Sequence, residues 1–257
     1  MTATDATAST VSRAGTTQAL GIDIIRGFSG MSSVRQLDAV LADRGAIWSR
    51  ALLLGDFSNR LPVAHLRLGI MLLSGWTSLE ERAAFREGPG YRKLTNGGDV
   101  SLDLGAGMVR STYENVTLNP DGWDALLPVG KSPRGTVAVL TYTRVRPRSI
   151  WAFQRLAHAV AISAAESEGC IGSAFGTMPA APLMRVMSLT LWNRRAHASQ
   201  WAYNGDTHPE AIAWLLEAPR RMPGGFVARF PIVAAAGVLH GIDLAAALER
   251  ADGGSAA

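Results

Sequence analysis

The sequence predicts an α+β protein built from two consecutive copies of one small unit. The main evidence is a pattern that occurs once in each half. An apolar strand ends in a tryptophan, a polar turn follows, and a helix places a second aromatic residue nine positions after the tryptophan. The two pairs are Trp76 with Phe85 and Trp192 with Trp201. With 257 residues, 47% of them hydrophobic, the chain is long enough for one large domain or two small ones.

The first repeat, residues 20–118, shows the element order β-α-β-β-α-β of a ferredoxin-like unit. Its first helix begins after Ser32 or Ser33, either of which can act as the N-cap, carries apolar residues at spacings of three and four through Leu41, and ends at Gly45. We expect strands at 21–26 and 47–57, a strand ending at Trp76, a helix from Leu79 to about Phe85, and a strand within 100–116.

Residues 119–135 separate the two repeats, because they hold a density of proline and glycine that no helix or central strand tolerates. The second repeat, residues 136–241, follows the same order. We expect a strand at 136–146, a helix at 149–166, strands at 170–177 and 183–192, a helical region at 194–220 and a strand at 226–233. Residues 1–19 are predicted to be a disordered N-terminal segment and 242–257 a C-terminal tail.

A ferredoxin-like sheet is covered by helices on one face only, so its other face must be buried against something else. We therefore expect the two sheets to pack face to face and a ligand to bind between them. A tandem repeat of this kind closes within one chain the barrel that single units make by dimerising, which leaves both a monomer and a homodimer open.

Charge and cysteine content argue against several classes of function. The net charge is only +4 and no dense basic run occurs, so nucleic-acid binding is not expected. Cys170 is the only cysteine, which rules out an intrachain disulfide and a cysteine-based metal cluster and favours a reducing compartment. No secretory signal or membrane-length apolar segment is found, so we expect a cytoplasmic protein without integral membrane association.

The usual motifs of several enzyme classes are missing from the sequence. It has no G-x-G-x-x-G after a strand, no Walker loop, no G-x-S-x-G elbow and no H-E-x-x-H helix. Dinucleotide binding, nucleotide-triphosphate binding, α/β-hydrolase and zinc-protease functions therefore lack support.

An ordered set of residues in both halves points to a known family. The second repeat contains Leu191-Trp192, Trp201-Ala202-Tyr203, His208, Ala211-Ile212, Phe226-Val227-Ala228-Arg229-Phe230 and Gly237, and the first has Trp76, Gly88 and Tyr91. With these residues the chain resembles spheroidene monooxygenase and its relatives in the dimeric alpha-beta barrel superfamily, over roughly residues 20–241. The resemblance implies tandem ferredoxin-like repeats that form a dimeric-alpha-beta-barrel-like fold within one chain.

The resemblance also implies an activity. Members of the family are haem-dependent oxygenases of lipophilic substrates such as carotenoids, so the expected cofactor is haem b with its iron. The expected partners are a hydrophobic small-molecule substrate, dioxygen and an external electron donor. The chain departs from the family pattern at Pro223-Gly224-Gly225, where a glutamate and a bulky residue are usual, and at 237–241, which lacks a tryptophan between its glycines. These departures bear on the substrate more than on the fold.

His208 is the strongest candidate for the metal ligand. Thr207 and Glu210 form an S/T-x-x-E capping box, and Pro209 suits the first helical turn. His208 is thus predicted at a helix N-terminus, where the helix dipole disfavours imidazolium and keeps a nitrogen lone pair available, as a proximal haem ligand requires. The alternative is a surface histidine on a well-capped helix.

The helix at 149–166 offers a second set of candidates. Trp151, Arg155, His158 and Ile162 share one stripe at spacings of four, three and four. If that stripe borders the ligand cavity, Arg155 is expected to pair with a haem carboxylate and His158 to act as a ligand or a polar group beside it. The alternative is half-buried packing with a solvated arginine.

Arg229 is a further candidate for cofactor binding. Strand alternation places it on the face opposite Phe226 and Phe230, where its guanidinium can hold a carboxylate or simply face solvent. Trp192 and Trp201 are candidates to line a pocket for a flat apolar molecule, although aromatic residues at these spacings also suit an ordinary core. His65, His197 and His240 show no shared spacing and are expected to be structural or exposed.

These observations favour a haem-dependent monooxygenase that oxidises an apolar or amphipathic small molecule, with His208 as the proximal ligand and His158 as a further catalytic candidate. Two alternatives stay open. One is a cofactor-free monooxygenase of the antibiotic-biosynthesis type, in which the substrate carbanion itself reacts with oxygen. The other is a non-enzymatic protein that binds haem or another hydrophobic ligand.

Overall fold

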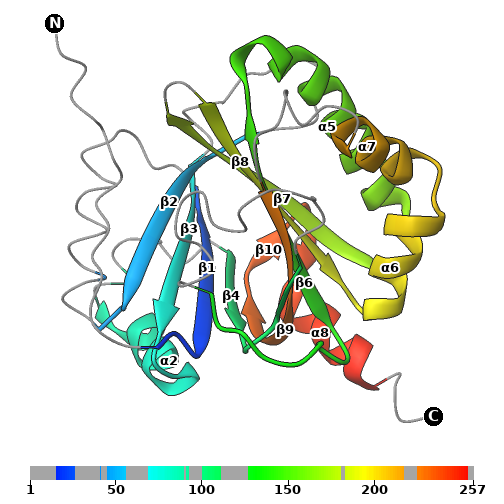
Figure 1. Ribbon diagram of the computed structural model, residues 1–257. Coiled ribbons are helices and arrows are strands. Elements are labelled where there is room, and N and C mark those ends of the chain that lie inside the picture. Colours follow the sequence, from blue (N-terminus) through cyan, green and yellow to red (C-terminus); the bar gives the residue numbers. More distant parts are fainter. Residues whose placement is uncertain are drawn as a thin grey trace, which may run out of the picture.

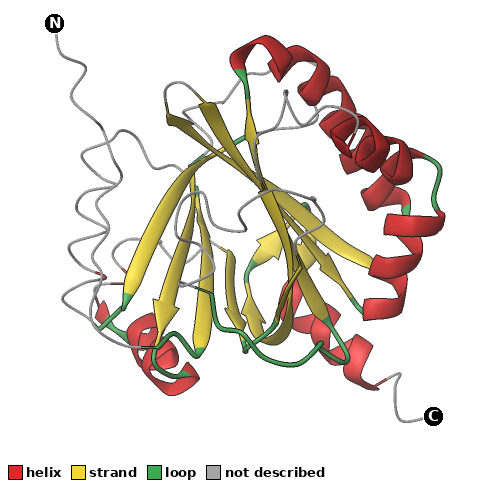
Figure 2. Ribbon diagram, viewed as in Figure 1, coloured by secondary structure: helices red, strands yellow, loops and turns green. Residues whose placement is uncertain are grey.

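The computed structural model describes residues 16–26, 41, 45–55, 69–89, 91–92, 100–110, 127–180, 183–216 and 225–253. In these residues a large antiparallel sheet curls round on itself, and helices lie on its outer side (Figure 1). Figure 2 shows how the strands gather in the middle of the molecule while the helices stay at its periphery. The predicted α+β class is confirmed.

The first repeat forms a four-stranded sheet in the order β4-β1-β3-β2, as expected of a ferredoxin-like unit. The predicted strand within 100–116 is two strands, because the glycine-containing turn at 105–107 interrupts it. The helix predicted from Ser32 or Ser33 to Leu41 falls outside the described residues except for Leu41, which is buried and helical. The elements are β1 (Ala19–Ile25), β2 (Trp48–Leu54), β3 (Ile70–Trp76), α2 (Leu79–Glu87), β4 (Val100–Leu104) and β5 (Met108–Arg110).

The second repeat forms the equivalent sheet in the order β9-β6-β8-β7. The helical region predicted at 194–220 contains, in its described part up to residue 216, two helices, α6 and α7, which are separated at Gly205 and Asp206. The elements are β6 (Val137–Val145), the short 3-10 helix η1 (Pro147–Ser149), α5 (Ile150–Glu166), β7 (Cys170–Ala180), β8 (Leu183–Trp192), α6 (Arg195–Asn204), α7 (Thr207–Leu216) and β9 (Gly225–Ala236).

The two sheets join edge to edge and close a barrel of eight strands, which corrects the expectation that they pack as two separate layers. β2 pairs with β7 through Leu53 and Leu54, and β4 pairs with β9 along Ser101 to Leu104. The physical reason is that each sheet has two outer strands with unpaired backbone groups, and closure satisfies both sets.

The inside of the barrel is a packed core and not the expected ligand chamber. Apolar side chains from both repeats fill it, including Ile22, Trp48, Leu140, Tyr142 and Phe230, all of which are buried. A barrel of this strand number has an interior just wide enough for side chains to fill. The cavity described below lies on the other side of the sheet from this core.

The chain after the second repeat also packs on the barrel. Residues 242–257, expected to form a tail, contain part of a short hairpin, β10 (Val238–Leu239) with β11 (Ile242–Asp243), and the helix α8 (Leu244–Gly253). Leu244 and Ala247 of α8 are buried against the barrel core. None of the helices in the described part of the chain has the length and hydropathy that a membrane span needs.

Candidate functional site

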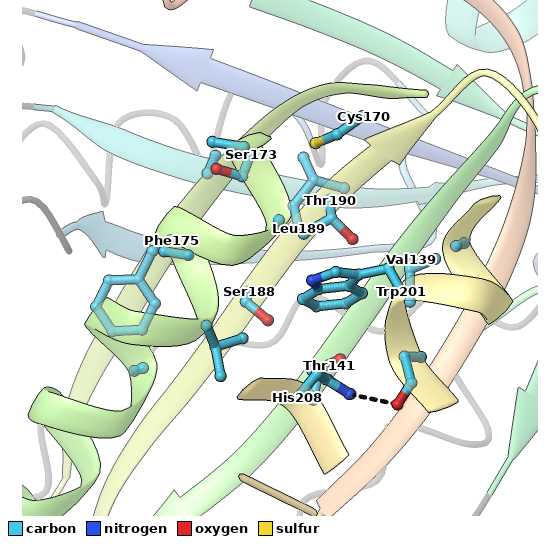
Figure 3. Close-up of a pocket in the computed structure, with 18 of the residues that line it drawn as sticks. Val139, Thr141, Cys170, Ser173, Phe175, Ser188, Leu189, Thr190, Trp201 and His208 are labelled. Atoms are coloured by element: carbon cyan, nitrogen blue, oxygen red, sulfur yellow. Dashed lines mark hydrogen bonds between the residues drawn. The ribbon is translucent and has the colours of Figure 1, made fainter. Parts of the chain in front are cut away.

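A cavity of about 460 Å³ lies on the outer side of the second-repeat sheet, beneath α5, α6 and α7. We call it the second-repeat pocket (Figure 3). Its volume lies in the range of small-molecule sites, and most of its lining is apolar. The pocket is therefore suited to a largely apolar ligand, although it lies on the other side of the sheet from the chamber that the sequence predicted.

Strand alternation divides the second-repeat sheet between the barrel core and the pocket. On β6, Leu140 and Tyr142 point into the barrel core, whereas Val139 and Thr141 line the pocket. The pocket floor consequently carries a group of hydroxyl side chains, Thr141, Thr143, Ser173, Ser188 and Thr190. The helices above it contribute mainly small apolar residues.

His208 lines the pocket and lies in the first turn of α7, which begins at Thr207 as predicted. Its Nδ1 is 3.0 Å from the carbonyl oxygen of Ala202. Because a carbonyl oxygen can only accept, Nδ1 must carry the proton, and Nε2 holds the lone pair in the neutral ring. The residues that the structure describes offer Nε2 no hydrogen-bond partner.

Burial keeps this imidazole neutral. Desolvation lowers the pKa of His208 below its ordinary value, against a smaller opposing effect of the hydrogen bond to Ala202. The ring also lies against the indole of Trp201, with 4.2 Å between the ring centroids (Figure 3). The structure thus holds His208 as a neutral, oriented base inside an apolar pocket.

Both predicted tryptophans line the same pocket. Their ring centroids are 5.2 Å apart. The ring of Trp201 contacts both the ring of Trp192 and that of His208. Each indole N–H has a partner: Trp192 donates to Thr190 at 2.8 Å and Trp201 to Ser163 at 3.2 Å. These bonds fix the orientation of the aromatic wall.

Arg229 also lines the pocket, on β9, and only 8% of it is exposed. The predicted alternation is confirmed, since Phe226 and Phe230 lie in the barrel core on the other face. Among the described residues that line the pocket, none is an aspartate, a glutamate or a lysine, so Arg229 contributes the one permanent charge there. The pocket therefore has a cationic side chain in its wall.

Arg155 and His158 do not line the pocket. Arg155 is exposed, and Trp151 of the same stripe is 57% exposed, because α5 turns its other face, with Phe153 and Ala157, toward the sheet. Of the predicted stripe, Ile162 lines the pocket, whereas Trp151, Arg155 and His158 do not. Neither Arg155 nor His158 is placed to contact a ligand in this pocket.

A histidine and a cysteine of the pocket, His240 and Cys170, were not among the predicted site residues. His240 is exposed at its edge, with a left-handed backbone (φ 50°), and its Nε2 donates to the carbonyl oxygen of Ser173 at 2.8 Å. The signal for this turn was the pair of glycines that flank 238–240.

Cys170 lies at the start of β7, and burial raises the pKa of its thiol. His65 is outside the described residues, and His197 contacts Asn193.

The described residues contain no group of three or more His, Cys, Asp or Glu side chains that could hold a metal ion. Axial ligation of a haem iron requires one nitrogen and no such group. His208, with its free ring nitrogen and its hydrogen-bonded second nitrogen, meets the requirement for such an axial ligand.

Comparison with known proteins defines the fold. No protein-family model and no curated protein sequence matches the chain. Among solved structures, an aldoxime dehydratase superposes with a TM-score of 0.52 at 10% identity over 87% of this chain and 84% of that one. A second aldoxime dehydratase, crystallised with butyraldoxime, gives 0.48 at 8% identity over 87% and 82%.

A candidate monooxygenase of Fusobacterium nucleatum is also similar, with a TM-score of 0.37 at 8% identity over 86% of this chain and 94% of that one. At these identities the likeness shows the fold alone. The superposition on the aldoxime dehydratase with a TM-score of 0.52 agrees with the predicted arrangement of two ferredoxin-like repeats in one barrel.

Proposed function

We propose that this protein is a haem-dependent enzyme that oxidises an apolar or amphipathic small molecule, with the iron bound by His208 in the second-repeat pocket. The observation that carries the proposal is the state of the His208 ring. Its Nδ1–H is committed to the Ala202 carbonyl at 3.0 Å, which leaves the Nε2 lone pair for a metal. Metal-binding histidines in proteins are characteristically held in this way.

The rest of the pocket fits the same cofactor. A porphyrin is flat and apolar with carboxylates at one edge, and the pocket combines an aromatic wall, Trp192 and Trp201, with a cationic side chain, Arg229. Guanidinium binds carboxylate through charge-assisted hydrogen bonds that strengthen as water is excluded. Arg229 therefore supports the binding of a propionate or of another anionic group.

Haem, when bound, supplies the one-electron and oxygen chemistry that side chains cannot provide. The residues of this chain bind, orient and protect it. Ala202 holds the His208 ring in one tautomer, Trp201 packs against that ring, and the small apolar residues of α5 exclude water. An apolar substrate, dioxygen and an external electron donor complete the proposed reaction, in line with the resemblance to the spheroidene monooxygenase family.

The test is haem binding by purified protein. Hemin titration of the wild type should give a Soret band with the position and intensity of a histidine-ligated haem. His208→Ala should lose this band or shift it, and added imidazole should restore it by replacing the missing ring. His197→Ala is the control, because His197 contacts Asn193 and does not line the pocket. It should bind hemin as the wild type does.

Two results would overturn the proposal. One is a wild-type protein that takes up no hemin under reconstitution. The other is His208→Ala with an unchanged spectrum, which would place the iron elsewhere. A colourless protein that consumes oxygen with a phenolic substrate would instead support the cofactor-free alternative.

A further inference from the structure

The first repeat contains a buried ionic cluster that sequence patterns did not predict. Arg82 of α2 is 0% exposed, and its guanidinium donates to Asp23 at 2.5 Å, to Ser101 at 2.9 Å and to Asp103 at 3.1 Å. Tyr91 donates to the same oxygen of Asp23 at 2.8 Å. Three aromatic rings, those of Trp76, Phe85 and Tyr91, lie 5.7 to 5.9 Å from the central carbon of the guanidinium.

The strand registers allow the two repeats to be compared residue by residue. Ala19 pairs with Trp76 in the first repeat, and Val137 pairs with Trp192 in the second, so these two pairs are equivalent. Counting along the strands makes Gly21 equivalent to Val139 and Asp23 to Thr141. Through the next pairing, Asp103 is equivalent to Arg229 and Ser101 to Val227.

The aromatic residues correspond as closely as the strands do. The rings of Trp76 and Phe85 are 5.0 Å apart with 36° between their planes, and those of Trp192 and Trp201 are 5.2 Å apart with the same angle. Trp76 donates to Ser74 at 2.9 Å, and Trp192 donates to Thr190, the equivalent residue, at 2.8 Å. Next to the second ring lies Tyr91 in one repeat and His208 in the other.

At one pair of equivalent positions the side chains differ greatly in size. Arg82 is the sixth residue after Trp76, and the sixth after Trp192 is Ala198, which is buried on α6 at the edge of the pocket. The residues equivalent to the surroundings of Arg82 all line the second-repeat pocket: Val139, Thr141, Thr190, Trp192, Trp201, Val227 and Arg229. The pocket therefore occupies the place that the side chain of Arg82 fills in the first repeat.

The charge of the floor is also reversed. Two carboxylates, Asp23 and Asp103, face the Arg82 cation in the first repeat. In the second repeat a hydroxyl, Thr141, and a cation, Arg229, stand at these positions. The first repeat thus has the guanidinium of Arg82 above two carboxylates, whereas the second repeat has an open pocket above the cation Arg229.

We propose that both repeats contain the same pocket, that Arg82 fills it in the first repeat, and that Ala198 leaves it open in the second for a flat, apolar ligand whose anionic group binds Arg229. Ala198 is then the residue that determines entry, and of the two equivalent places in the described structure only the one in the second repeat is open. The choice of an anionic ligand rests on the proposed function of this pocket, whereas the equivalence of the two repeats does not. The anionic group belongs either to a haem propionate or to a separate carboxylic acid substrate.

A charge exchange tests the equivalence without any ligand. Ala198→Arg places a second guanidinium beside Arg229 and should lower the unfolding temperature. Adding Arg229→Asp recreates the Arg82–Asp103 pair, so the double variant should unfold at least about 5 °C above the value expected from adding the two single effects. Additive single effects, or a double variant less stable than either single one, would overturn the equivalence even if the protein binds haem.

An uncharged variant tests whether Ala198 determines ligand entry, in case Ala198→Arg does not fold. Ala198→Met fills the space, and Ala196→Met is the matched control, because Ala196 is exposed on the same helix. Ala198→Met should weaken binding of both hemin and anthracene carboxylic acid by more than about tenfold, whereas Ala196→Met should not. Binding by Ala198→Met that equals the wild type would overturn the gating role.

The negative charge of the ligand is tested with pairs of probes, each an acid and its ester. Wild-type protein should bind anthracene carboxylic acid about tenfold more tightly than its methyl ester, and hemin more tightly than hemin dimethyl ester. Arg229→Gln should abolish the preference. If the protein prefers the acid over the ester for hemin alone, the anionic group belongs to the cofactor. If hemin-loaded protein prefers anthracene carboxylic acid over its methyl ester, the anionic group belongs to the substrate. Equal binding of acid and ester in both pairs would overturn the anionic assignment.

Discussion

At the scale of single residues, the buried position of His208 matters as much as its identity. A histidine on a capped helix would ordinarily titrate near neutrality. Here the pocket desolvates the ring and lowers its pKa, while Ala202 takes the Nδ1 proton. The same contacts that prepare a metal ligand therefore make the folded state sensitive to acid.

The free energy of unfolding should consequently fall as the pH drops below about 6.5, the ordinary histidine value. The folded pKa of His208 is lowered, so the unfolded chain binds the proton more tightly and gains stability relative to the folded one in acid. The slope for one group is at most about 1.4 kcal/mol per pH unit. Urea unfolding from mildly acid to neutral pH measures it. His208→Gln should show a smaller slope, and an identical slope in both proteins would contradict the assignment.

Arg82 is the other residue with a large predicted effect. Arg82→Met removes the only cation in contact with Asp23 in the described structure and should cost about 3–5 kcal/mol, as expected when one partner of a buried ion pair is removed. Arg92→Met is the control, since Arg92 is exposed and its guanidinium donates to the backbone carbonyl of Glu87. It should change the free energy of unfolding by less than about 1 kcal/mol. Denaturant unfolding of both variants gives the comparison.

At the scale of elements, periodicity in the sequence predicted strands and helices well because each element buries one face. β3, β8 and α5 lie within a few residues of their predicted bounds. The pocket is lined mainly by the other stripe of α5, and spacing alone did not distinguish the two, since Trp151 and Arg155 are as regularly spaced as Phe153 and Ala157. Which stripe faces inward depends on how the helix packs on the sheet, and this tertiary packing cannot be read from the spacing of residues in the helix.

The same reasoning explains why the Arg82 cluster was missed. Asp23 and Asp103 each interrupt an apolar strand, and Arg82 lies on the inner face of α2. Charged residues at core positions are a recognisable signal of a buried ion pair. Their pairing, however, depends on strand register, which brings Gly21 opposite Asp103 and opposite Ser74. Local spacing contains no information on that register.

The start of α2 provides a prediction for an element. Ser78 is its N-cap, and its hydroxyl accepts from the backbone N–H of Glu81 at 3.2 Å. Ser78→Ala should therefore lower the free energy of unfolding by about 1 kcal/mol. Ser78→Asp should retain most of it, because a carboxylate also accepts this bond and interacts favourably with the helix dipole. Equal losses in both variants would show that the cap contributes nothing.

At the scale of the whole molecule, the barrel makes the two repeats one structural unit. Their sheets are joined at β2–β7 and at β4–β9, and one core inside the barrel draws side chains from both (Figure 1). The pocket, in contrast, is lined mainly by the second repeat, with Gly55 as the contribution of the first. Duplication has therefore kept the shared core and let the two outer faces diverge, one filled by Arg82 and the other open.

The shared core predicts a single cooperative unfolding transition. Ile22 and Leu140 occupy equivalent positions in β1 and β6, and both lie in that core. Ile22→Ala and Leu140→Ala should each cost about 2–5 kcal/mol, as large-to-small core substitutions do. Buried tryptophans lie in both repeats, Trp48 and Trp76 in the first and Trp192 in the second, so near-ultraviolet circular dichroism and backbone circular dichroism should report the same lowered midpoint for both variants. If Ile22→Ala instead splits the transition and leaves the later step at the wild-type midpoint, the repeats fold independently and the barrel core does not couple them.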